Sequence, residues 1–82
     1  MIPIITVVLP CNASKWLFDL VRFIMAGRLA DKAQVIVSIG PAEGVAVNIQ
    51  GGLFDNIESL ELLEEYARDI IRAILSNKVL YN

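Results

Sequence analysis

The feature that most constrains the fold is a nearly continuous apolar run over residues 2–9, rich in β-branched side chains. Such a run is typical of a strand that is buried on both faces, because a half-exposed strand alternates apolar with polar residues. Pro3 has no N–H to donate to a sheet, so it must lie at the start of this strand. The run therefore predicts a strand at the centre of a sheet.

A helix is predicted over residues 12–29, directly after this strand. Asn12 is a candidate N-cap, and Cys11 and Trp16 have the spacing of a hydrophobic staple around it. Ser14 is the alternative cap. The first helix of the chain therefore begins at one of two neighbouring polar residues.

Two segments, 33–39 and 45–50, alternate apolar with polar residues and predict two further strands. The link between them, 41–44, is short enough for a hairpin, so we expect these strands to be antiparallel neighbours. Ile36 and Ala46 share the face opposite the main apolar set, where Gln34, Ser38, Asn48 and Gln50 dilute them. That face suits a sheet-to-sheet dimer or a ligand platform.

A second helix is predicted to start near Asp55, which with Glu58 forms a capping-box-like pattern, and to end at about Ser76. Its first half is acidic and its second half holds Arg68 and Arg72, an order that complements the helix dipole. Residues 78–81 are either a short last strand or a frayed tail.

The element order β-α-β-β-α(-β) predicts a single α+β domain over residues 1–82. With the hairpin, it fits the split β-α-β, or ferredoxin-like, plan of a two-layer sandwich. In that plan both helices cover one face of a small mixed sheet, and the first strand lies in the middle beside the third. The other face of the sheet is left bare.

The apolar share of 56% is high and the charged share of 20% is low for a soluble domain, in which about 45–50% and about 25% are usual. The surplus lies partly on the first helix, whose apolar arc is roughly twice what one sheet face needs. Its expected core face is Leu17, Leu20, Val21 and Ile24. The flanking residues either wrap the edge of the core or form an oligomer interface. The interface predicted on the two helices comprises Trp16, Phe18, Phe23, Met25, Leu62 and Tyr66.

Several function classes are disfavoured by simple counts. The chain has no histidine and one cysteine, which disfavours histidine-based catalysis, most zinc sites and an internal disulfide. A formal net charge of −2 disfavours nucleic acid as a partner. No signal peptide or membrane-spanning segment is evident, so we expect a cytoplasmic protein. No acid–base pair, metal set or activated nucleophile can be assembled, so we expect no enzyme and no cofactor.

The loop before the first helix is the best ligand-site candidate. Asn12, Ser14 and Lys15 lie where a helix N-terminus favours an anion, although Asn and Ser are also ordinary capping residues. Cys11, in the same loop, is expected to be a packed thiol. On the second helix, Glu58, Glu61 and Glu65 form an acidic face that is either solvated or a docking surface for a protein partner.

Two function classes stay open on this basis. The first is a small non-enzymatic interaction or regulatory protein, of the inhibitor or adaptor type, that acts as a homodimer or higher oligomer. The second is an oligomeric binder of a small anionic ligand, such as a nucleotide or metabolite, at the first strand–helix loop.

Overall fold

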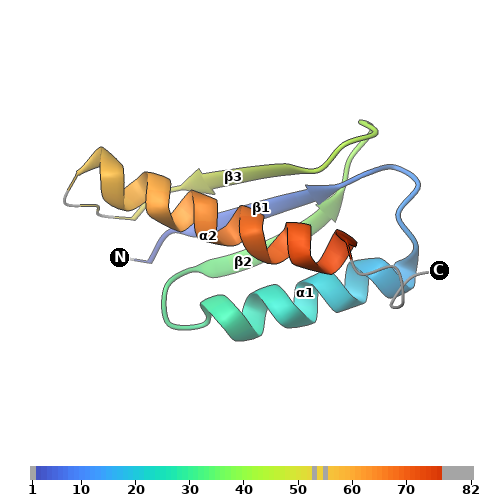
Figure 1. The fold of residues 1–82 in the computed structure, drawn as a ribbon, viewed down its shortest axis with the longest axis horizontal. Helices are drawn as coiled ribbons and strands as arrows, with labels where there is room; N and C mark the ends of the chain where they lie inside the picture. Colours follow the sequence, from blue (N-terminus) through green and yellow to red (C-terminus); the bar gives the residue numbers. More distant parts are fainter. Residues whose placement is uncertain (1, 53, 55, 77–82) are drawn as a thin grey trace.

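Three strands and two helices follow one another in the predicted order β-α-β-β-α (Figure 1). The structure, a computed structural model, describes residues 2–52, 54 and 56–76. The elements are β1 (Ile4–Leu9), α1 (Lys15–Leu29), β2 (Gln34–Ile39), β3 (Ala46–Gln50) and α2 (Ile57–Ser76). The segment 78–81, predicted as a strand or a tail, lies outside the described residues.

The apolar first strand lies at the centre of the sheet, as predicted. The strand order is β2-β1-β3, in which β1 pairs with β2 in parallel and with β3 antiparallel. The register places Val7 of β1 opposite Val37 on one side and Val47 on the other. The sheet is therefore mixed and small, and β1 is beside β3.

The predicted hairpin between the second and third strands is wrong, because β1 lies between them. In the split plan those two strands are neighbours, so the observed order departs from the ferredoxin-like prediction in this pairing. Residues 40–45 instead cross the end of β1, a distance of roughly 10 Å or two strand spacings. Backbone hydrogen bonds hold the crossing: Gly40 N donates to Leu9 O at 2.9 Å, and Cys11 N donates to Ala42 O at 3.1 Å.

Both helices cover the same face of the sheet (Figure 1). The side chains of Ile5, Val7 and Leu9 point toward them and are fully buried. Ile4, Thr6 and Val8 alternate with these residues, lie on the opposite face and are only half-buried. The two-layer α+β architecture with one bare sheet face is thus confirmed.

Side chains cap the start of both helices. Ser14, the alternative cap, accepts a hydrogen bond from Leu17 N at 3.1 Å, so α1 begins at Lys15 and the first choice, Asn12, is wrong. The side-chain oxygen of Asn56 accepts from Ser59 N at 2.9 Å at the start of α2. Asp55, the predicted cap of this helix, lies outside the described residues.

The core face of α1 is rotated from the predicted one. Its fully buried residues are Val21, Met25 and Leu29, whereas Leu20 and Ile24 are only half-buried. Met25 is therefore a core residue and cannot form an oligomer interface while the chain stays folded. On α2 the helical spacing of the apolar residues predicts a core face of Leu60, Leu63, Ala67, Ile70, Ile71 and Ile74. The structure confirms it, since the last four are buried and the two leucines are half-buried.

Candidate functional site

The residues of the predicted anion site form hydrogen bonds and an ion pair within α1. The Ser14 hydroxyl caps the helix, and Lys15 Nζ lies 2.8 Å from Asp19 Oδ2 in an exposed ion pair one turn along. Asn12 is exposed in the preceding turn. The loop therefore has the arrangement of an ordinary capped helix start, in which hydroxyl and ammonium groups serve the helix itself.

Cys11 is exposed, so the interpretation of this residue as a packed thiol is wrong. Its backbone N–H bonds to Ala42 O and fixes the loop after β1 to the loop after β2. The contribution of Cys11 to the fold described here comes from its backbone.

The outer surface of the helix layer carries large exposed apolar side chains. Trp16 and Phe23 of α1, spaced by two helical turns, are 49% and 80% exposed, and they lie opposite the buried side of the helix. Leu62 and Tyr66 of α2, spaced by one turn, are 62% and 38% exposed. We refer to these four residues as the helix-layer surface. Phe18, also predicted here, is half-buried against the core instead.

Shallow cavities occur on the same side of the molecule. One of about 290 Å³ is lined by Lys32, Leu62, Leu63 and Tyr66, and the Lys32 ammonium lies 5.8 Å from the centre of the Tyr66 ring. A second, of about 220 Å³, lies between the helices and is lined by Ile24, Arg28, Ile70, Ala73 and Ile74. The helix layer is therefore an indented apolar surface, which a partner could fill.

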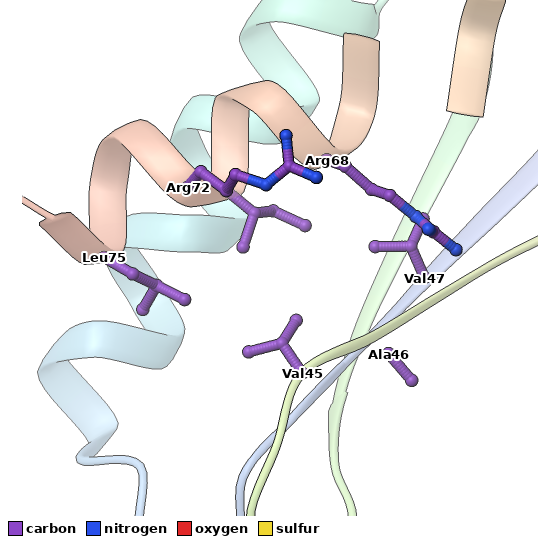
Figure 2. A pocket seen from close by; sticks show the side chains of 7 residues that line it. Val45, Ala46, Val47, Arg68, Arg72 and Leu75 are labelled. Atoms are coloured by element: carbon purple, nitrogen blue, oxygen red, sulfur yellow. The ribbon is translucent and has the colours of Figure 1, made fainter. Parts of the chain in front are cut away.

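A larger groove of about 460 Å³ lies between β3 and the C-terminal half of α2 (Figure 2). We call it the β3–α2 groove; its lining is Val45, Ala46, Val47, Arg68, Ile71, Arg72 and Leu75. The two arginines are its charged residues. Arg68 is paired with Glu64 at 2.7 Å and Arg72 with Asp69 at 2.9 Å, and both ion pairs connect residues of α2 at helical spacing.

Sequence reasoning missed this groove, because it places β3 beside β2 and not at an edge. The sequence places Arg68 and Arg72 in the second half of this helix, yet there it indicates only a charge order that complements the helix dipole. Their relation to Val45 and Val47 depends on the strand order, which no local pattern reports.

The acidic face predicted on α2 is exposed. Glu58, Glu61 and Glu65 all face solvent, and a shallow cavity beside them is lined by Glu61, Glu64, Glu65, Arg68 and Arg72. Negative charge is thus concentrated in the first half of α2, and the β3–α2 groove begins where the basic residues follow.

The open face of the sheet is more polar than the helix-layer surface. Ile2 and Ile36 are 59% and 44% exposed there. The pairing register surrounds them with Gln34, Ser38, Asn48, Gln50 and Thr6.

No known protein family, curated protein or solved structure matches this chain. Neither of the two described helices is long and apolar enough to cross a membrane. In the described part of the chain, no three His, Cys, Asp or Glu side chains are grouped so that they could hold a metal ion. The surfaces themselves must therefore carry the argument about function.

Proposed function

We propose that this chain is a small interaction protein, of the adaptor or inhibitor type, that acts as a homo-oligomer through its helix-layer surface. The supporting observation is the exposure of Trp16, Phe23, Leu62 and Tyr66 on one layer of a small domain. Aromatic side chains are enriched at protein interfaces, and a few buried residues, Trp and Tyr prominent among them, contribute most of the binding free energy there. Exposed large apolar side chains in this number on a small domain favour an association site.

The helix-layer surface supports self-association better than the open sheet face does. Its exposed residues are large and include three aromatic side chains, whereas the sheet face mixes two exposed isoleucines with amides and hydroxyls. Polar groups on such a face lose their bound water on binding and must find new hydrogen-bond partners. The free-energy cost of this desolvation offsets the gain from burying Ile36.

The acidic face formed by Glu58, Glu61 and Glu65 is the second part of the proposal. These carboxylates are exposed on α2 beside Leu62, and their charge suits a basic protein partner. The alternative function, binding of a small anionic ligand at Asn12, Ser14 and Lys15, has less support because two of these side chains already bond within α1.

The proposal is tested by measuring the mass of the chain in solution. We expect light scattering coupled to gel filtration at tens of micromolar to give the mass of a dimer or larger oligomer. The double variant Phe23→Glu with Leu62→Glu places two charges in the interface and is expected to be monomeric, because a buried unpaired carboxylate is costly.

Ile36→Glu is the matched control, since it places the same charge on the opposite layer. This variant is expected to keep the wild-type mass. A monomeric wild-type chain would contradict the proposal, and dissociation caused by Ile36→Glu alone would assign the interface to the sheet instead.

A further inference from the structure

We propose that the β3–α2 groove binds an extended acidic peptide segment of a partner protein, added as a strand to the free edge of β3. The bound segment carries carboxylates at alternate positions, which meet Arg68 and Arg72. The site is separate from the helix-layer surface, so this inference does not depend on the homo-oligomer.

The outer edge of β3 is suited to strand addition. Among the described residues β3 pairs only with β1, so within that part of the chain the backbone N–H and C=O groups on its other side have no strand partner. The strand, Ala46–Gln50, contains no charged residue and no proline, the features with which proteins usually protect an edge against pairing. Partner segments commonly bind by extending such an edge, with alternate side chains in pockets.

The two arginines can bind carboxylates from a partner. Each of them contacts its helix neighbour through one nitrogen, Nη2 of Arg68 and Nη1 of Arg72, and a guanidinium has five N–H donors. The arginine side chains are 49% and 71% exposed, and ion pairs in such positions contribute little to stability. Exchanging the present ion pairs within α2 for pairs with a partner's carboxylates therefore has a small cost. The lining of the groove itself contains no carboxylate, so the carboxylates that compete with a ligand are Glu64 and Asp69, the helix partners of the two arginines.

The spacing of these charges matches an extended chain. Residues four apart on a helix are separated by roughly 6 Å along its axis. Residues two apart on a strand, which share a face, are separated by roughly 6.6 Å. In Figure 1, α2 runs alongside β3, and Figure 2 shows the arginines on the α2 side of the groove with Val45 and Val47 on the other. An acidic residue at every second position therefore meets both guanidinium groups.

The apolar part of the groove lining determines which residues are favoured at the non-acidic positions of the bound segment. Its floor is formed by apolar side chains, Val45, Val47, Ile71 and Leu75, so apolar residues between and beside the acids are favoured. A strand from a second copy of the chain fits poorly, because β1, β2 and β3 contain no Asp or Glu. The composition of the groove thus points to a different protein as the partner.

The experiment is a fluorescence anisotropy titration of the full chain with a labelled peptide that alternates Val with Asp. We expect saturable binding that weakens as salt is raised, since exposed charges are screened. Arg68→Gln and Arg72→Gln are each expected to weaken binding roughly tenfold, the loss typical of one charge-assisted hydrogen bond. Arg22→Gln, a matched change at an exposed arginine of α1, is expected to leave binding unchanged.

Two control peptides test the charge and the strand geometry separately. A peptide of alternating Val and Asn keeps the shape without the charge, and a Val-Val-Asp-Asp repeat keeps the charge without the alternation; both are expected to bind at least tenfold more weakly. The proposal would be overturned if the Val-Asp peptide does not bind, or if either control peptide binds as tightly as the Val-Asp peptide. It would also be overturned if neither arginine variant changes the affinity for the Val-Asp peptide.

The oligomer test remains distinguishable from this one. The monomeric Phe23→Glu, Leu62→Glu variant is expected to bind the Val-Asp peptide as the wild type does, and the arginine variants are expected to keep the wild-type mass. A loss of peptide binding in the monomeric variant would mean that the groove is not an independent site, and would overturn the inference as stated.

Discussion

At the scale of single residues, Gly40 lies so close to Val8 that a Cβ atom there would collide with the Val8 Cγ1 atom. The valine is β-branched and cannot move aside freely. We expect Gly40→Ala to lower the free energy of unfolding by about 1–3 kcal/mol, as overpacking usually does. The measurement is a urea titration, in which the midpoint falls while the slope is unchanged.

Gly44 is the matched control for this prediction, since it lies at the other end of the same connection. A Cβ at Gly44 has no atom within 4 Å, so Gly44→Ala is expected to change stability by less than about 0.5 kcal/mol. Equal losses in the two variants would show that the close approach of residue 40 to Val8 does not constrain the loop.

Met25 and Phe23 lie two residues apart on α1 and differ fully in burial, at 0% and 80% exposed. We expect Met25→Ala to cost about 2–5 kcal/mol, because it leaves a cavity in the core. Phe23→Ala is expected to cost less than about 1 kcal/mol when measured at a protein concentration low enough for the monomer. A similar loss in both would place Phe23 in the core.

The burial of Met25 could not be predicted from the sequence, for a geometric reason. Apolar side chains cover more than half the circumference of α1, from Phe23 round to Phe18, while the sheet needs only about a third. Periodicity shows that the arc is wide, yet it does not show which part faces β1. On α2, where charged residues bound a narrow arc, the same reasoning found the correct core residues.

At the scale of elements, the start of α1 is a choice between two polar residues that the structure decides in favour of Ser14. Ser14→Ala removes the acceptor for Leu17 N, and we expect it to lower the free energy of unfolding by about 1 kcal/mol. Asn12→Ala, two residues earlier, is expected to change it by less than about 0.5 kcal/mol. Chemical denaturation of both variants checks this, and the reverse order would restore Asn12 as the cap.

The strand arrangement shows how far local patterns reach. The alternation in β2 and β3 and the apolar run in β1 predict three strands and place β1 at the centre, because such a run is typical of a strand buried on both faces. The structure keeps the central position but leaves Ile4 and Val8 on the outer face only half-buried. Which strand pairs with β2 cannot be predicted from a local pattern in the sequence. A six-residue connection can turn back as a hairpin or cross the end of β1. The bonds from Gly40 N to Leu9 O of β1 and from Cys11 N to Ala42 O of the connection stabilise the crossing.

The same limit applies to the candidate sites. The helical wheel predicts all four exposed residues of the helix-layer surface, since each depends on one helix alone, but it also predicts Phe18 and Met25, which pack against or within the core. The β3–α2 groove joins residues roughly twenty to thirty positions apart through the edge position of β3, so its prediction requires the strand order.

At the scale of the whole molecule, the large apolar share of the chain is divided between one shared core and exposed side chains on both outer surfaces. If the helix-layer surface is closed by a second copy, folding and association are coupled, and the stability of the chain depends on its concentration. For a homodimer of this length, each tenfold rise in concentration is expected to raise the Tm by roughly 4 °C.

This dependence is measured by scanning calorimetry across two decades of concentration. The Phe23→Glu, Leu62→Glu variant is expected to have a Tm that does not change with concentration, because a monomer unfolds in a concentration-independent step. Ile36→Glu is expected to retain the wild-type slope. A flat wild-type response would mean that the exposed aromatic side chains of the helix layer do not contribute to folding through association, and that the monomer is stable with its apolar surface in water.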